Sequence, residues 1–85
     1  MTGDEIRCAR ALAGCTFPPA QWDKRFCRAM GEIAVGDPGR ELTERQSLWI
    51  FKLTVRYRRQ INKSVVHLAK GKLKEIENAD QLTGS

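Results

Sequence analysis

The sequence predicts an all-α fold, a small bundle of three to four helices in which the third helix is central and mostly buried. Two segments carry the capping-box pattern of a helix N-terminus, Thr2 with Glu5 and Thr43 with Gln46. Apolar residues recur at helical spacing between turns that contain proline or glycine. No segment alternates apolar and polar residues over a length that would indicate a strand.

The first helix is expected to follow Thr2 and to cover residues 3–13. Glycine commonly ends a helix, so Gly14 is the expected stop. Residues 17–19 read Phe-Pro-Pro and predict a turn, because successive prolines cannot continue a helix. The apolar residues of the first helix recur at helical spacing: Ile6, Ala9, Leu12 and Ala13.

A second helix is expected over about residues 20–35, and its apolar and charged residues separate onto two faces. The face expected to be buried is lined by Trp22, Phe26, Met30 and Ile33, with Ala29 beside them. The face expected to point to solvent carries Lys24, Arg25 and Arg28.

The loop over residues 36–40 separates the second helix from a third, which starts near Glu44 and reaches at least Ile61. Leu42 lies where a hydrophobic staple would fix the start of this helix. Asn62 either ends the third helix or is crossed by it.

A last helical segment is expected over residues 64–78. Gly71 weakens it by about 1 kcal/mol relative to alanine. Residues 1–80 would form one domain, and residues 81–85 a flexible tail. The apolar side of this segment carries Val65, Val66, Ala69, Leu73 and Ile76.

Charge is distributed unevenly along the chain, whose formal net charge is +5. Residues 45–74 contain nine basic residues and no acidic one, so the rest of the chain has six basic residues against ten acidic ones. A segment with charge of one sign sets up a field that attracts an oppositely charged partner. Nucleic acid is the polyanion that this distribution favours.

On a continuous third helix, at about 100° per residue, five basic side chains would share an arc of roughly 60° with Trp49 at its edge. Such a strip has the donors for phosphate contact and an indole that could stack on a base. A protein partner bound through the same surface, or a merely solvated helix face, remain alternatives. The candidate binding residues are Arg45, Trp49, Lys52, Arg56, Arg59 and Lys63, extended by Lys70, Lys72 and Lys74.

Other classes of function find little support. The loop of seven residues over 36–42 is too long for the turn of a helix-turn-helix motif. Cys8, Cys15 and Cys27 have neither zinc-finger spacing with His67 nor the even number of a disulfide scaffold, so packed, reduced thiols and a surface or packed histidine are expected. No phosphate-binding glycine loop or paired-carboxylate motif is present, and we predict a protein that is not an enzyme and uses no cofactor or metal.

Size and hydropathy set the remaining expectations. A domain of 85 residues buries only about 60% of the surface that its unfolded chain exposes. A partner or a second copy of the chain would add to its stability, so a homodimer is one alternative. No run approaches the ~20 apolar residues of a membrane span, and the N-terminus lacks a signal-peptide pattern. A cytoplasmic protein without membrane contact is therefore expected.

Two blocks of sequence carry a family resemblance. Residues 15–19 read CTFPP and lead into WDKRF at residues 22–26, while residues 42–46 read LTERQ and are followed by VRYRRQI at residues 55–61. With these blocks the chain resembles short bacteriophage and prophage proteins that have no assigned activity, over roughly residues 5–61.

The resemblance implies a protein made in a bacterial host cell. Small phage proteins of this size often act as accessory factors on DNA or RNA, or as stoichiometric inhibitors of host enzymes, including anti-CRISPR proteins. Inhibitors that mimic DNA are typically acidic, whereas this chain is basic. A basic inhibitor or adaptor would instead bind an acidic surface of a host protein, or lie beside nucleic acid on a host complex.

Overall fold

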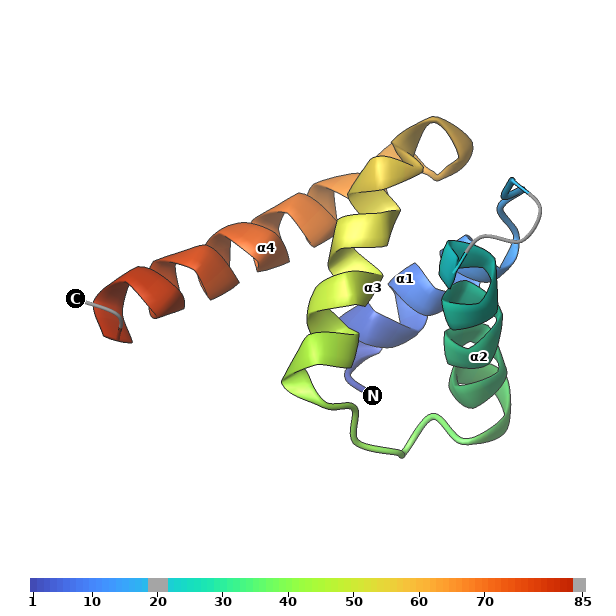
Figure 1. The fold of residues 1–85 in the computed structure, drawn as a ribbon, viewed down its shortest axis with the longest axis horizontal. Helices are drawn as coiled ribbons and strands as arrows, with labels where there is room; N and C mark the ends of the chain where they lie inside the picture. The colour runs from blue at the N-terminus through green and yellow to red at the C-terminus, as the bar shows by residue number, and fades with distance from the viewer. Residues whose placement is uncertain (19–21, 84–85) are drawn as a thin grey trace.

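A computed structural model describes residues 1–18 and 22–83, with the backbone alone for residues 78–83. The predicted all-α bundle is confirmed, because every element in those ranges is helical. Figure 1 shows α1, α2 and α3 packed together, while α4 extends past them toward the C-terminus. The elements in chain order are α1 (Gly3–Ala13), α2 (Trp22–Gly36), α3 (Glu44–Arg56), the short 3-10 helix η1 (Arg58–Gln60) and α4 (Lys63–Thr83).

Capping boxes start α1 and α3, as predicted. The hydroxyl of Thr2 accepts a hydrogen bond from the Glu5 N–H at 3.2 Å, and the Glu5 carboxylate accepts one from the Thr2 N–H at 2.6 Å. Thr43 and Gln46 make the same reciprocal pair at 3.1 and 3.0 Å. Each box satisfies two backbone donors that a helix start leaves without partners. Helix α1 ends at Gly14, also as predicted.

Helix α3 lies in the centre of the bundle, where it contacts α1, α2 and α4. The hydroxyl of Thr54 is buried but donates to the Ile50 carbonyl at 2.8 Å, so its burial leaves no polar group unsatisfied. The buried residues of α3 are Ile50, Phe51, Leu53 and Thr54. Its exposed residues are Glu44, Arg45, Lys52 and Arg56.

The buried face of α2 differs from the predicted one. Trp22 and Ala29 are exposed, and Phe26 and Ile33 are only half-buried, so the helix is rotated by roughly one residue, about 100°. Residues 20 and 21, where this helix was expected to begin, lie outside the described residues. Lys24, Arg25 and Arg28 point to solvent as predicted. Met30 is buried as predicted. The other residues that face inward are Asp23, Cys27, Gly31 and Ala34.

Two contacts explain this rotation. Asp23 faces the interior because its carboxylate accepts hydrogen bonds from Arg56, the last residue of α3, and from Tyr57. Gly31 faces α1, and a Cβ at this position would lie 2.7 Å from the Cβ of Ala13. The glycine therefore allows a closer approach of α1 and α2 than any side chain would permit.

The third helix ends at Arg56, so the prediction that it reaches Ile61 is wrong. Tyr57 leaves helical geometry, η1 follows, and Ile61 is extended. The side-chain oxygen of Asn62 then accepts from the N–H and the hydroxyl of Ser64, at 2.9 and 2.8 Å. Of the two alternatives at Asn62, the structure thus shows a break, with Asn62 stabilising the start of the next helix.

Helix α4 continues through Gly71 and ends at Thr83. Its predicted apolar side is confirmed, since Val66 and Ala69 are buried and Val65, Leu73 and Ile76 are half-buried. The helix extends into the expected tail at residues 81–85, of which residues 84 and 85 lie outside the described part. Although α4 is the longest helix, neither it nor another described helix has an apolar stretch long enough to cross a membrane.

The three cysteines are free thiols, and Cys8 and Cys27 are fully buried while Cys15 is half-buried. Burial raises the pKa of all three thiols, in the case of Cys27 to about 12. A thiol with a raised pKa is a poor nucleophile at neutral pH. The expectation of packed, reduced thiols is confirmed for Cys8 and Cys27.

Candidate functional site

The part of the predicted basic strip that lies on α3 is exposed on one face of that helix. Arg45, Lys52 and Arg56 point to solvent, and Trp49 between them is half-buried. The ammonium of Lys52 lies 5.2 Å from the centre of the Trp49 ring, within the range of a cation–π contact. Residues 45–56 therefore present cations and an indole together.

The expectation that all five basic residues line one helix is wrong. Arg59 belongs to η1 and Lys63 is the first residue of α4, so neither lies on α3. The break at Tyr57 and the cap at Asn62 turn the chain before the strip is complete. The basic residues are instead divided between α3 and the connection from α3 to α4.

Arg56 takes part in an internal network. The carboxylate of Asp23 accepts hydrogen bonds from Arg56 Nη1 at 3.1 Å and from the Tyr57 hydroxyl at 2.7 Å. The hydrogen bond to Asp23 raises the pKa of Tyr57 to about 12. Asp23 is buried, whereas the Arg56 side chain remains 57% exposed. We call these three residues the Asp23 network; it joins the start of α2 to the end of α3.

Four other cations gather where α3 turns into α4. Arg58 and Arg59 come from η1, and Lys63 and Lys70 come from α4. They line a surface depression of about 580 Å³ together with Ile61, Val66 and His67. All four are exposed, and none forms an ion pair within the described part of the chain. We call Arg58, Arg59, Lys63 and Lys70 the basic corner.

A second, smaller depression connects the basic corner to the Asp23 network. It has a volume of about 350 Å³ and is lined by Arg56, Tyr57, Arg58, Arg59 and Gln60. Arg58 and Arg59 line both depressions. Arg56 at the end of α3 and the cations of the basic corner thus lie on one continuous surface, bent at Tyr57.

The conformation of η1 is held by contacts with the connection between α1 and α2. The side-chain amide of Gln60 pairs with the backbone of Thr16, accepting from its N–H at 2.7 Å and donating to its carbonyl at 3.0 Å. The ring of Tyr57 meets the edge of Phe17 with ring centres 4.8 Å apart. Because the side chains of Tyr57 and Gln60 are directed at the connection between α1 and α2, Arg58 and Arg59 between them are left in solvent.

Arg58 is a candidate residue that the sequence pattern did not identify. On a continuous helix it would lie about 240° from Lys52, away from the basic strip. The 3-10 geometry places it beside Arg59 instead. Tyr57 and Gln60, which hold this segment in place, bind partners more than thirty residues away in the sequence. The local sequence therefore gave no signal that Arg58 would join the basic corner.

The three lysines expected to extend the patch have different environments. Lys63, Lys70 and Lys74 follow one another on a single exposed face of α4, so Lys74 continues the basic corner along the helix. Lys72 lies on the opposite side, 3.2 Å from the Asp4 carboxylate and 3.6 Å from Glu75. The hydrogen bond to Asp4 raises the pKa of Lys72, and the ion pair connects α4 to α1.

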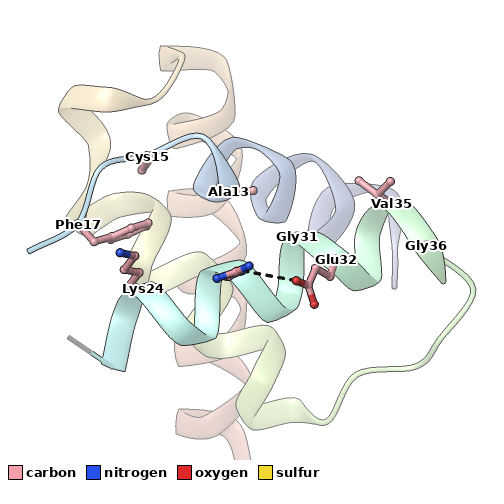
Figure 2. Close-up of a pocket in the computed structure, with 9 residues that line it drawn as sticks. Ala13, Cys15, Phe17, Lys24, Gly31, Glu32, Val35 and Gly36 are labelled. Atoms are coloured by element: carbon pink, nitrogen blue, oxygen red, sulfur yellow. Dashed lines mark ion pairs between the residues drawn. The ribbon is translucent and has the colours of Figure 1, made fainter. Parts of the chain in front are cut away.

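A different kind of depression lies between α1 and α2. It has a volume of about 610 Å³, and its lining includes Phe17 and Lys24 at one end and Val35 and Gly36 at the other (Figure 2). On its α2 side, Arg28 and Glu32 form an ion pair at 3.6 Å. Among the described residues, no three His, Cys, Asp or Glu side chains are grouped so that they could hold a metal ion.

The chain matches no family model, no curated protein and no solved structure. Its function is therefore inferred from the chemistry of its surfaces. The basic corner offers several cations to an anion, whereas the depression between α1 and α2 offers mainly apolar atoms to a side chain of a partner.

Proposed function

We propose that this protein is a non-enzymatic binding protein that contacts the sugar-phosphate backbone of nucleic acid through the basic corner and the exposed cations of α3. The supporting observation is the gathering of Arg58, Arg59, Lys63 and Lys70 around one depression, without an ion pair among the described residues. Arginine and lysine in solvent are the usual phosphate ligands, and arginine adds a planar pair of donors.

Contact with the backbone predicts weak sequence preference and strong dependence on salt. If the four cations each neutralise one phosphate, affinity should fall roughly 50- to 150-fold between ~50 and ~200 mM salt. Fluorescently labelled single- and double-stranded oligonucleotides, titrated at both salt concentrations, measure this. Absence of binding by the wild-type chain at ~50 mM salt would contradict the proposal.

The matched pair of variants is Arg58→Glu with Arg59→Glu, and Arg7→Glu with Arg10→Glu. All four arginines are exposed, and both double variants change the net charge equally. The first is expected to weaken binding by at least ~10-fold and to reduce the salt dependence by about two phosphate contacts. The second should stay within a few-fold of wild type. Equal weakening by both would mean that overall charge, and not the basic corner, drives binding.

An inhibitor or adaptor that binds a host protein or nucleoprotein complex is the second candidate. It is favoured by the depression between α1 and α2, which ends at Val35, an apolar residue that is 75% exposed. The resemblance of residues 5–61 to phage proteins agrees with such a role. On this hypothesis Val35→Asp abolishes binding to the partner, while the double variant at Arg58 and Arg59 retains it.

A further inference from the structure

An aromatic cluster lies on the surface beside the cations of α3. The Trp22 ring stacks on Phe26, with centres 4.9 Å apart and planes 19° from parallel. It also meets the Trp49 ring edge-on, with centres 5.3 Å apart. Trp22 is 53% exposed, which is unusual for so large an apolar side chain. We call Trp22, Phe26 and Trp49 the aromatic cluster.

The exposure of Trp22 follows from the Asp23 network. Asp23 is directed inward by its hydrogen bonds to Arg56 and Tyr57, so the preceding residue on α2 points away from the core. The indole cannot turn inward unless the helix rotates and buries Trp22 in place of the carboxylate. The network that orders the end of α3 therefore also presents Trp22 to solvent.

Cations of α3 lie along one side of the aromatic cluster. Lys52 lies over the Trp49 ring, and Arg45 and Arg56 lie about one turn before Trp49 and one turn after Lys52 on the same exposed face of α3. The surface beyond Arg56 continues into the basic corner. The exposed indole of Trp22 thus lies beside a surface that attracts polyanions. This position favours nucleic acid over an apolar peptide as its ligand.

We propose that Trp22 stacks on an unpaired base, so that the preferred ligand of this surface is single-stranded nucleic acid. This inference depends on the proposed function, because the cations must hold the backbone while the indole contacts the base. In a duplex the base faces are stacked on one another and an indole cannot reach them, whereas an unpaired strand exposes them. Alternating aromatic and basic side chains are the usual design of surfaces that bind single strands.

The test uses the full chain, a thymidine homopolymer and a duplex of the same length, at ~50 mM salt, with indole fluorescence and labelled-strand anisotropy as readouts. Trp22→Ala should weaken binding to the single strand roughly 5- to 150-fold, the range for loss of one stacked base, and leave the duplex within about twofold. Trp22→Phe keeps an aromatic face and should recover most of the loss. Val35→Ala is the matched control, because it removes the other large exposed apolar side chain of α2.

Each outcome separates the two proposals. Unchanged single-strand affinity in Trp22→Ala, with loss of binding in the double variant at Arg58 and Arg59, overturns the stacking inference and leaves the proposed function intact. Equal loss on single strand and duplex also overturns it, since no base face is then recognised. If the wild type binds neither oligonucleotide, both proposals fail and the aromatic cluster becomes a surface for a protein. Circular dichroism of each variant excludes loss of folding as the cause.

Discussion

Arg56 and Arg58 are two residues apart, yet one belongs to the Asp23 network and the other to the basic corner. In the Asp23 network a cation, a phenol and a buried carboxylate satisfy one another across the α2–α3 interface. In the basic corner four cations share a depression and have no acidic partner among the described residues. Neighbouring positive charges thus differ in their partners. Arg56 binds a carboxylate of the same molecule, whereas the four cations of the basic corner face solvent.

The difference shows why a count of basic residues does not define a binding surface. Nine basic residues lie between positions 45 and 74, but Arg56 and Lys72 are paired with Asp23 and with Asp4 and Glu75. Paired cations have less positive potential to offer a phosphate. We therefore expect substitutions in the Asp23 network to change mainly stability, and substitutions in the basic corner to change mainly binding.

The largest effect on stability is expected from Asp23→Ala. The substitution removes the acceptor for both Arg56 and Tyr57, and it should lower the free energy of unfolding by about 1–3 kcal/mol. Urea denaturation followed by circular dichroism measures it. Arg59→Ala is the control from the basic corner and should stay within about 0.5 kcal/mol of wild type, because its side chain is exposed. Similar losses in the two variants would remove the distinction between the two regions.

Alkaline titration of the Tyr57 hydroxyl tests the Asp23 network directly. Tyr57 is the single tyrosine of the chain, so tyrosinate absorbance reports on it alone. Its hydrogen bond to Asp23 raises its pKa to about 12, compared with about 10 in an unfolded chain. The stabilisation by this bond is complete below about pH 10 and is lost as the pH rises through about 12. Asp23→Ala removes the acceptor and should return the midpoint toward 10; an unchanged midpoint would rule out the hydrogen bond.

A smaller effect is expected from Gln60→Ala, which removes both hydrogen bonds to the Thr16 backbone. Because the pair is exposed, the loss should be about 1 kcal/mol. The same change frees η1 from its anchor, so the affinity for oligonucleotides should fall a few-fold with no change in net charge. Combined denaturation and anisotropy measurements test this; a stability loss without an affinity loss would mean that binding does not depend on the Gln60 anchor of η1.

Lys72→Ala should have the smallest effect. Its ion pairs with Asp4 and Glu75 are partly in solvent, where salt screens them. The melting temperature should fall slightly at low salt and match wild type at high salt. Oligonucleotide affinity should change less than in Lys70→Ala, although both variants lose one positive charge. A larger affinity loss at Lys72 would show that the ion pairs do not withdraw this lysine from binding.

Local sequence was sufficient for most of the helix boundaries and insufficient for the orientation of α2. Thr2 and Thr43 predict the helix starts because a capping box is satisfied within four residues. The rotation of α2 could not be predicted from periodicity, which places Trp22 on the buried face and gives no reason to bury the Asp23 carboxylate. Asp23 is buried because Arg56 and Tyr57, over thirty residues away, supply its hydrogen bonds.

By itself, the sequence determined the all-α class, the helix starts at residues 3 and 44, and the charge asymmetry of residues 45–74. These features depend on interactions between residues close in the chain, or on composition alone. Tertiary structure decided where α3 ends, which cations remain in solvent, and that Trp22 is exposed. Those outcomes depend on partners brought together by folding: Thr16 with Gln60, Asp23 with Tyr57, and Asp4 with Lys72.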